Sequence, residues 1–230
     1  MKKILITGAN RGLGLEHTRR FVMRGVFVYA TARAPREAEE LNQLARAHPE
    51  LVQVLPYDAL DAEAPAQLKA ELANVALDLV FLNAGAMSAR PPFGNIDSQA
   101  ALQLFQINTL APLKLAEALV ENVVSSQRKI LAFQSSLMGS ITDNGSGGAY
   151  AYRISKCALN MAVKNMAIDL REQGVIAVAL HPGWVKTRMG GVQAPLALAD
   201  SVQGQQQLLF NLTLAQSGGF FNHDGKSLPW

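Results

Sequence analysis

The sequence has only one cysteine and few charged side chains. Because Cys157 is the single cysteine among 230 residues, no disulfide can form within the chain, which fits a reducing compartment such as the cytoplasm. Charged residues make up 17% of the chain, the formal net charge is +3, and charges of both signs are mixed along it. This balance gives little support for a nucleic-acid partner.

Long hydrophobic runs are also missing. Two lysines followed by an apolar run at residues 4–6 briefly resemble a secretion signal, but the run stops at Thr7, far short of a signal's apolar core. No stretch approaches the ~20 apolar residues that a membrane span requires. We therefore expect a soluble, cytoplasmic protein without a membrane partner. Apolar residues still make up 49% of the chain, enough for a large buried core.

Short apolar runs alternate with longer helical patterns along most of the chain. The apolar runs predict strands at residues 3–7, 26–31, 51–55, 77–83, 129–135 and 175–181. The helical patterns cover residues 13–24, 35–47, 62–73, 98–124, 150–173 and 199–214. This alternation predicts a parallel sheet covered by helices on both faces. Because no linker or repeat interrupts it, we expect one domain over residues 1–230, ending in a short extended tail.

The first predicted strand runs directly into a glycine-rich turn, Thr7-Gly8-Ala9-Asn10-Arg11-Gly12-Leu13-Gly14. Glycine lets the backbone turn tightly and approach a pyrophosphate, and the helix that follows offers unpaired N–H groups to the anion. Such a turn can also serve only to join a strand to a helix. Its position after the first strand favours the dinucleotide-binding interpretation.

The end of the second predicted strand bears on the choice of cofactor. Folds that prefer NAD usually place Asp or Glu there, whereas an arginine nearby accommodates the 2′-phosphate of NADP. Here the strand ends in Thr31-Ala32-Arg33, and the next carboxylate is Glu37. Arg33, helped by Arg11, can meet that phosphate; the alternative is that both arginines are solvated surface side chains. We expect NADP(H) to be preferred, with NAD(H) as the alternative.

A tyrosine and a lysine lie four residues apart in a predicted helix. Tyr152 and Lys156 therefore share one helix face. An ammonium beside a phenol lowers the phenol's pKa from about 10, so that the phenol can exchange a proton with a carbonyl or alcohol near neutral pH. Tyr150 is the rival, but it precedes Lys156 by six residues and lies about 240° round the helix. With the glycine-rich turn, the pair predicts a nicotinamide-dependent oxidoreductase.

The chain resembles the short-chain dehydrogenase/reductase family over essentially its whole length. The matching pieces, in family order, are the Thr7 to Gly14 turn, Asp58, Asn83-Ala84-Gly85, Asn108, Ser136, Tyr152 with Lys156, and Pro182-Gly183 before Thr187. Within the family it is similar to the C-factor and sniffer-type carbonyl reductases, in residues 139–141, 147–153, 183–187 and 224–230. The resemblance implies a single doubly wound Rossmann-type α/β domain with a mostly parallel sheet of about seven strands.

The resemblance also implies four catalytic residues. Tyr152 would be the general acid, and Lys156 would lower its pKa and hydrogen-bond the nicotinamide ribose. Ser136 would hold the substrate oxygen, and Asn108 would support a water that relays protons to Lys156. Ser135 is the rival to Ser136; because successive strand residues point to opposite faces, only one of them should face the site.

The cofactor contacts that the resemblance implies lie near the ends of the predicted strands. Asp58 and Asn83 would contact the adenosine side, and the segment after the sixth strand would wrap the nicotinamide. The full set is Gly8, Asn10, Arg11, Gly12, Leu13, Gly14, Arg33, Asp58, Ala59, Asn83, Ala84, Gly85, Tyr152, Lys156, Pro182, Gly183, Val185 and Thr187. The histidines show no metal-ligand spacing, so no metal site is expected. His181 and Cys157 are expected to be packed rather than reactive.

Two segments depart from the common family pattern. The spacing from Ser136 to Tyr152 is longer than usual, and residues 142–148 account for the extra length. The segment after Thr187 is short, so residues 188–197 are expected to form only a small substrate lid over an open pocket.

These observations predict an NADPH-dependent carbonyl reductase, or an alcohol dehydrogenase in reverse. It would transfer hydride between nicotinamide and a small to medium ketone, aldehyde or quinone. The alternative is a non-catalytic NADP(H)-binding signalling protein of C-factor type, which would not need all four catalytic residues. Enoyl reduction and sugar epimerisation are less favoured. By analogy with the family we expect a homodimer or homotetramer formed through helices 98–124 and 150–173, where Met161 and Ile168 would face outward.

Overall fold

The computed structural model describes residues 1–88 and 91–230. Within them, seven strands form one sheet in the order β3-β2-β1-β4-β5-β6-β7, and every neighbouring pair is parallel. The strands are β1 (Lys3–Ile6), β2 (Phe27–Ala32), β3 (Val52–Pro56), β4 (Leu79–Leu82), β5 (Ile130–Gln134), β6 (Ile176–His181) and β7 (Phe220–Asn222). The predicted α/β fold is confirmed, and the sheet described here is parallel throughout rather than mostly parallel.

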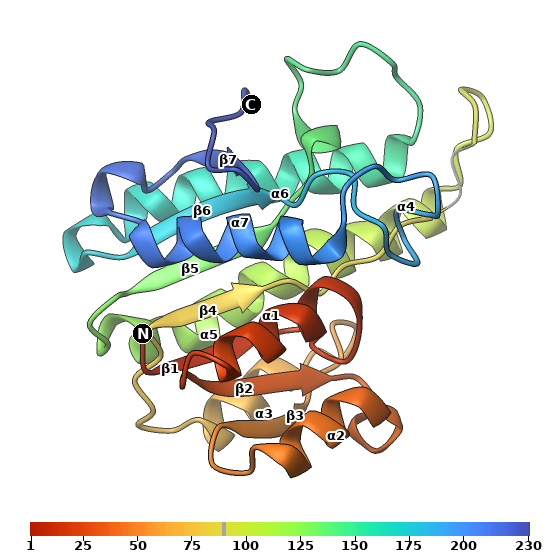
Figure 1. The fold of residues 1–230 in the computed structure, drawn as a ribbon. Helices are drawn as coiled ribbons and strands as arrows, with labels where there is room; N and C mark the ends of the chain where they lie inside the picture. The colour runs from red at the N-terminus through yellow and green to blue at the C-terminus, as the bar shows by residue number, and fades with distance from the viewer. Residues whose placement is uncertain (89–90) are drawn as a thin grey trace.

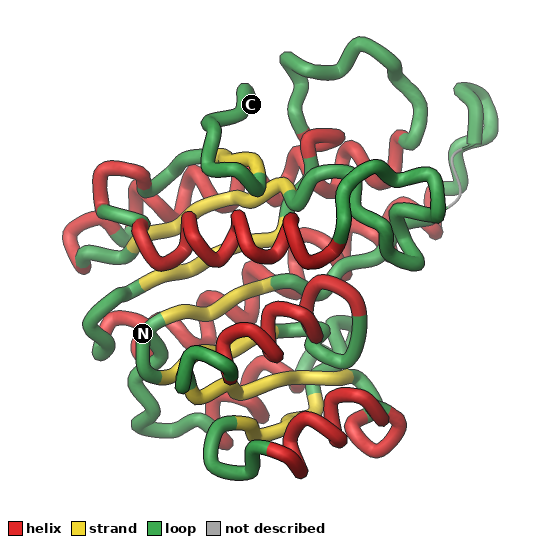
Figure 2. The backbone as a smooth tube through the Cα atoms, in the orientation of Figure 1, coloured by secondary structure: helices red, strands yellow, loops and turns green. Residues whose placement is uncertain are grey.

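Seven α-helices in the described residues flank this sheet (Figures 1 and 2). They are α1 (Gly12–Val22), α2 (Glu39–Ala47), α3 (Ala64–Glu71), α4 (Ser98–Phe105), α5 (Ala111–Val124), α6 (Tyr150–Asp169) and α7 (Leu198–Asn211). Short 3₁₀ turns lie at Pro35–Glu37, Leu137–Gly139, Arg171–Gln173 and Leu214–Gln216. None of the helices in the described residues is long and apolar enough to cross a membrane.

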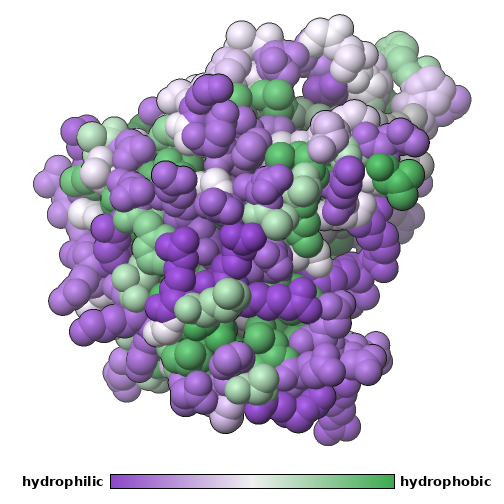
Figure 3. Space-filling model, in the orientation of Figure 1, coloured by the Kyte–Doolittle hydropathy of each residue, from purple (hydrophilic) through white to green (hydrophobic). Residues whose placement is uncertain are grey.

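The alternation of strand side chains divides the core into two layers. Ile4 and Ile6 of β1 belong to one buried cluster with residues of α1, α2 and α7. Leu5, between them, belongs to a second cluster with residues of α3, α5 and α6. Successive strand residues point to opposite faces, so each helix layer covers its own face of the sheet. The face carrying α1, α2 and α7 is mainly hydrophilic on its outside, with smaller apolar areas (Figure 3).

The strand order reverses at β1, and this reversal locates a binding edge. From β1 the chain builds β2 and β3 on one side, then crosses to β4 on the other. The chain therefore leaves β1 and β4 towards opposite sides of the sheet at their carboxyl ends. In open α/β sheets, ligands bind at such a switch point. The glycine-rich turn leaves β1 here, and Asn83 follows β4.

The predicted helix over residues 98–124 is interrupted in the structure. Gln106–Leu110 form a π-helical turn between α4 and α5, where the amide of Ala111 donates to the carbonyl of Gln106. Pro112 supplies a physical reason, because proline has no N–H to donate and its ring would clash with the carbonyl four residues earlier, that of Asn108. The turn that carries Asn108 is therefore wider than a regular helix, a feature often found at functional sites.

Gly14 provides a test of how tightly α1 packs on the turn that precedes it. A Cβ at this position would overlap the carbonyl oxygen of Gly8 and lie 2.7 Å from Nδ2 of Asn83. We expect Gly14→Ala to lower the free energy of unfolding by about 1–3 kcal/mol, because the backbone must shift to make room. The urea unfolding midpoint measures this.

Gly145→Ala is the matched control. Gly145 has no atoms within 4 Å of an added Cβ and does not have a positive φ, so its midpoint should stay within about 0.5 kcal/mol of the parent protein. Equal midpoints for the two variants would contradict the packing argument.

Candidate active site

The turn after β1 and the end of β4 are hydrogen-bonded into one unit. The side-chain amide of Asn83 donates to the carbonyls of Thr7 at 2.9 Å and Gly8 at 3.3 Å. The amide of Ala84 donates to the hydroxyl of Thr7 at 3.0 Å. Gly8 and Gly12 have φ of +64° and +53°, the left-handed region that favours glycine. The sequence-predicted phosphate turn thus has the tight shape that close approach of a pyrophosphate requires.

Helix α1 begins directly after this turn with its positive end open. Arg11 occupies the N-cap position in an extended conformation and makes no capping hydrogen bond through its side chain, and the first turn contains no acidic residue. The first amides of a helix lack intrahelical acceptors and favour negative charge. The end of α1 could therefore hold a phosphate group.

Three exposed arginines lie near this helix end. Burial first, and then the positive charges of Arg188 and Arg33, lower the pKa of Arg11. Arg33 follows β2, as the sequence predicted, whereas Arg188 comes from the segment after β6 and was not among the expected contacts. Within residues 1–88 and 91–230, none of the three forms an ion pair with a carboxylate.

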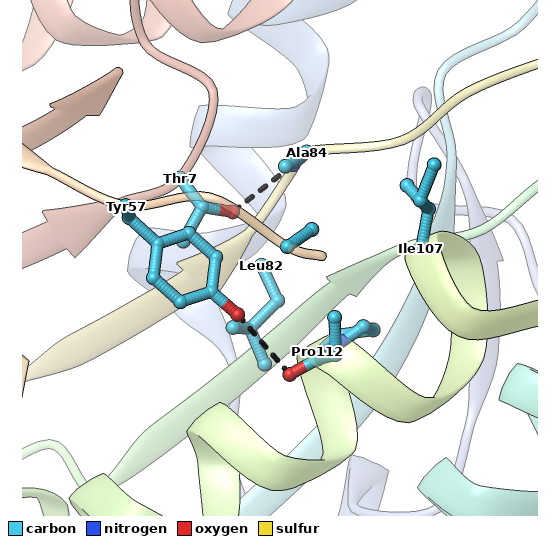
Figure 4. A pocket seen from close by; sticks show the side chains of 8 residues that line it. Thr7, Tyr57, Leu82, Ala84, Ile107 and Pro112 are labelled. Carbon is cyan, nitrogen blue, oxygen red and sulfur yellow. Dashed lines mark hydrogen bonds between the residues drawn. The ribbon is translucent and has the colours of Figure 1, made fainter. Parts of the chain in front are cut away.

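A small pocket lies beneath the loops that follow β3 and β4 (Figure 4). Its lining includes Thr7, Tyr57, Ala59 and Ala84, and the hydroxyl of Tyr57 donates to the carbonyl of Ala111 at 3.3 Å. Burial, and to a smaller extent Asp58, raise the pKa of Tyr57 above its usual value, so the phenol stays neutral. The cavity holds about 10 Å³, room for roughly one water, so it is too small for a dinucleotide.

The expected catalytic pair lies on the inner face of α6. Tyr152 and Lys156 are 7% and 4% exposed, and the lysine Nζ is 6.0 Å from the centre of the tyrosine ring. Nζ donates a 2.8 Å hydrogen bond to the backbone carbonyl of Gln134, at the end of β5. Burial lowers the pKa of Lys156 to about 8, because the interior disfavours the charged form. The ammonium can therefore exchange its proton close to neutral pH.

Tyr150, the rival to Tyr152, has different surroundings. It is the first residue of α6 and is partly exposed, with its ring 5.9 Å from the ring of Phe93. The left-handed Ala149 and the preceding Gly147 and Gly148, all at positive φ, turn the chain into the helix. This start of α6 places Tyr152, rather than Tyr150, on the buried face with Lys156.

The two neighbouring serines after β5 have different partners. Ser135 donates its hydroxyl proton to Oδ1 of Asn160 at 2.6 Å, within the core. The hydroxyl of Ser136 accepts from the amide of Met138 at 3.2 Å and caps the 3₁₀ turn Leu137–Gly139. An added Cβ at Gly139 would lie 2.8 Å from the backbone of Lys156, so this turn packs directly against α6 beside the lysine. Ser135 is thus committed to the core, whereas Ser136 begins the turn that packs against α6 beside Lys156.

Asn108 is held by three hydrogen bonds through its side chain. Its Oδ1 accepts from the amide of Ala86 at 2.8 Å, and its Nδ2 donates to the carbonyl of Ala86 at 2.9 Å and to the hydroxyl of Ser155 at 3.0 Å. A Cβ added at Gly85 would be 3.3 Å from Oδ1 of Asn108 and 3.5 Å from Nζ of Lys156. The loop after β4, the π turn and α6 therefore meet around Lys156.

Two of these partners were missed by the sequence reasoning. The acceptor at Gln134 is a backbone carbonyl, so its side chain gives no signal of the role. Ser155 lies next to Lys156 in the sequence, and neighbouring helix residues do not share a face. Its contact with Asn108 is set by the approach of two helices.

The segment after β6 folds back beside the glycine-rich turn. Gly183 has φ of +81°, and the carbonyl of Pro182 accepts from the hydroxyl of Ser201 of α7 at 2.6 Å. Val185 pairs with Leu196, which closes the segment at its base. The methyl group of Thr187 is 4.0 Å from the position of a Cβ on Gly12. A residue of the turn expected to bind the pyrophosphate and a residue expected near the nicotinamide thus lie close to one another.

Two histidines, His17 and His181, are held in the neutral form. Burial, and then the nearby His223, lower the pKa of His181 to about 4. His17 is fully buried on α1, where burial lowers its pKa to about 3, and it contacts Gln205 of α7 at 3.0 Å. Both are therefore neutral near pH 7. In the described part of the chain, no group of three or more His, Cys, Asp or Glu side chains is placed to hold a metal ion.

The chain is similar to known proteins in both sequence and structure. The short chain dehydrogenase family matches residues 2–195. "C-signal" of Myxococcus xanthus is 42% identical over 154 residues, which cover 67% of this chain and 93% of that protein. The solved structure of the carbonyl reductase Sniffer of D. melanogaster has a TM-score of 0.94 and 37% identity, covering 100% of both chains. The NADPH-bound carbonyl reductase from chicken fatty liver has a TM-score of 0.92 and 33% identity, covering 100% of this chain and 99% of that one.

These likenesses confirm the family resemblance drawn from the motifs, including its closer similarity to C-factor and sniffer-type proteins. The family match spans most of the sequence, and the structural matches span all of it. The chain therefore belongs to the short-chain dehydrogenase family and is a short-chain oxidoreductase.

Proposed function

We propose that the protein is an NADPH-dependent carbonyl reductase that acts on small to medium ketones, aldehydes or quinones, and on the matching alcohols in reverse. The observation that carries the proposal is the buried Tyr152–Lys156 pair of α6, beside Asn108 and at the same edge of the sheet as the glycine-rich turn. The NADPH-bound carbonyl reductase from chicken fatty liver supports the choice of cofactor and reaction.

The reaction requires a proton donor and a stabiliser of negative charge. Reduced nicotinamide would supply the hydride, which leaves developing negative charge on the substrate oxygen. Tyr152 donates a proton to that oxygen, and Ser136 stabilises the charge with a hydrogen bond. Lys156 keeps the phenol acidic by its positive charge and holds the ribose of the nicotinamide. In the reverse direction Tyr152 accepts the proton from the alcohol.

Asn108 takes part in the relay that returns a proton to Tyr152 after each reduction. Its side chain is committed to Ala86 and Ser155, so its backbone carbonyl is the group that can hold a water. Pro112 cannot donate the α-helical hydrogen bond to that carbonyl. A water held there relays protons to Lys156, whose pKa of about 8 allows exchange near neutral pH.

The arginines at the β2 end favour NADPH over NADH. Arg33 directly follows β2, no carboxylate occupies the end of that strand, and the positive charges of Arg33 and Arg11 act on each other. We propose that these two arginines bind the 2′-phosphate. Asp58, Ala59 and Asn83 contact the adenosine side, and Pro182, Gly183, Val185 and Thr187 enclose the nicotinamide under a short lid at residues 188–197.

A second candidate function is NADP(H)-dependent signalling without turnover. The specific observation in its favour is the 42% identity to "C-signal" of Myxococcus xanthus. The set of Asn108, Ser136, Tyr152 and Lys156 argues against it, because binding alone does not require a proton donor and its relay. Tight binding of NADPH without turnover of any carbonyl would favour this function.

Replacing the phenol hydroxyl tests the catalytic role of Tyr152. We expect Tyr152→Phe to lower kcat about 10²–10⁴-fold, as loss of a general acid does, while the Kd for NADPH stays within about threefold. Oxidation of NADPH would be followed by its absorbance with a panel of ketones, aldehydes, α-dicarbonyls and quinones.

Tyr150→Phe makes the same change two residues away on α6 and should keep near-normal turnover, since Tyr150 lies against Phe93. Substantial residual activity in Tyr152→Phe would remove Tyr152 as the acid.

Removal of the arginine after β2 tests the choice of cofactor. We expect Arg33→Ala to raise the KM for NADPH about tenfold or more, the scale of one charge-assisted hydrogen bond, with little change for NADH. Arg36→Ala, an exposed arginine in the next turn, is the control and should affect neither cofactor. An equal effect of Arg33→Ala on both cofactors would count against contact with the 2′-phosphate.

The outer face of α6 bears on assembly. Ile154, Met161 and Ile168 are 59%, 63% and 62% exposed and recur every seven residues, so they form one apolar stripe. We propose that this helix pairs with a second copy in a homodimer or homotetramer.

Light scattering during size exclusion tests this assembly. The parent protein should have a mass of two or four chains, and Met161→Glu should have a lower mass because a charge would enter the apolar contact. A single-chain mass for the parent protein would refute assembly.

A further inference from the structure

The turn at the start of the lid has a defined shape of its own. The hydroxyl of Thr187 accepts from the amide of Gly190 at 3.0 Å, and the carbonyl of Thr187 accepts from the amide of Gly191 at 2.9 Å. The indole of Trp184 donates to the carbonyl of Gly190 at 2.8 Å. These bonds close a compact turn in which the side chain of Arg188 is exposed.

This turn lies against the glycine-rich turn of the phosphate end. The methyl group of Thr187 is 4.0 Å from the position of a Cβ on Gly12. Arg11 precedes Gly12 in the sequence, and Arg188 follows Thr187. The two arginines are therefore carried by residues adjoining this close approach, although 177 positions (188 − 11) separate them in the sequence.

Three positive charges gather where the two turns approach each other. Arg188 and Arg33 both act on Arg11 through their positive charge, and within residues 1–88 and 91–230 none of these three side chains pairs with a carboxylate. Like charges held close together repel, and a bound anion removes the repulsion. The open amino end of α1, which has no acidic residue in its first turn, adds to the positive field.

We propose that Arg188 is a third phosphate-binding residue, carried by the lid, which contacts a phosphate of the bound dinucleotide together with Arg11. This inference rests on the proposed NADPH-dependent function. Two phosphate sources are present in that cofactor, the pyrophosphate and the 2′-phosphate, and a guanidinium suits either because its planar fork can bind two phosphate oxygens at once.

The contact links cofactor binding to the position of the lid. The turn that carries Arg188 continues into residues 191–197, whose base is fixed by the pairing of Val185 with Leu196. A phosphate held by Arg188 would thus draw the start of the lid towards the cofactor. Arg188 acts in this way as a binding and positioning residue, not as a catalytic one.

Direct titration of the full-length protein with NADPH and with NADH tests the proposal. We expect Arg188→Ala to weaken NADPH binding about tenfold, and Arg188→Lys to recover part of the loss because it restores charge without the fork. Lys186→Ala is the matched control, because it removes one exposed positive charge from the same segment but is not among the charges that act on Arg11. It should change the Kd by no more than about twofold.

The two cofactors identify the phosphate. A loss confined to NADPH supports contact with the 2′-phosphate, and an equal loss for NADPH and NADH supports contact with the pyrophosphate. Arg188→Ala that binds both cofactors as tightly as Lys186→Ala overturns the proposal and leaves the reductase function intact. A parent protein that binds neither dinucleotide overturns the proposed cofactor and the role of Arg188 together.

Discussion

The burial of one ammonium group is the constraint around which the candidate active site is built. Lys156 is almost completely enclosed, and burying a charge is costly unless polar groups surround it. The structure supplies the carbonyl of Gln134 as a direct partner, and Gly85 and Gly139 keep two loops close without side chains. The pKa of Lys156 is nevertheless lowered, because burial still disfavours the charged form. A neutral side chain would suit this position better for stability alone, and this favours the proposed chemical role of Lys156.

The same position couples three parts of the chain that are distant in sequence. The loop after β4, the π turn and α6 all meet at Lys156 and Asn108. The three parts hold one another in place. The side-chain amide of Asn108 hydrogen-bonds both the backbone of Ala86 and the hydroxyl of Ser155. Because hydrogen bonds within such a network support one another, the site is expected to be rigid before any ligand arrives. That rigidity suits a reaction in which donor and acceptor must be aligned.

Much of the fold and the central motifs could be predicted from the sequence. Apolar runs predicted six strands to within two residues at each end, because a strand buried on both faces leaves a continuous apolar signature. The seventh strand, Phe220–Asn222, is too short to leave one.

The π turn was missed although Pro112 indicated it, since the surrounding helical periodicity was interpreted as continuous. Arg188 was missed for another reason: its nearness to Arg11 arises from the folding of a loop, which periodicity and motif spacing do not encode. The roles of Ser136, Tyr152 and Lys156 remain predictions, which the geometry favours.

The π turn before Pro112 confines the irregular backbone to a short segment. The helices on either side of it can then keep regular hydrogen bonding for stability. In α4 and α5 every interior backbone group can be used for stability, so many sequences with the right apolar face would serve. In the five residues Gln106–Leu110 the role proposed for Asn108 makes the backbone itself a functional group, one that no side-chain substitution can supply or replace. Variation among homologous chains should therefore be tolerated along most of α4 and α5, and restricted at the π turn and at Pro112, the second residue of α5.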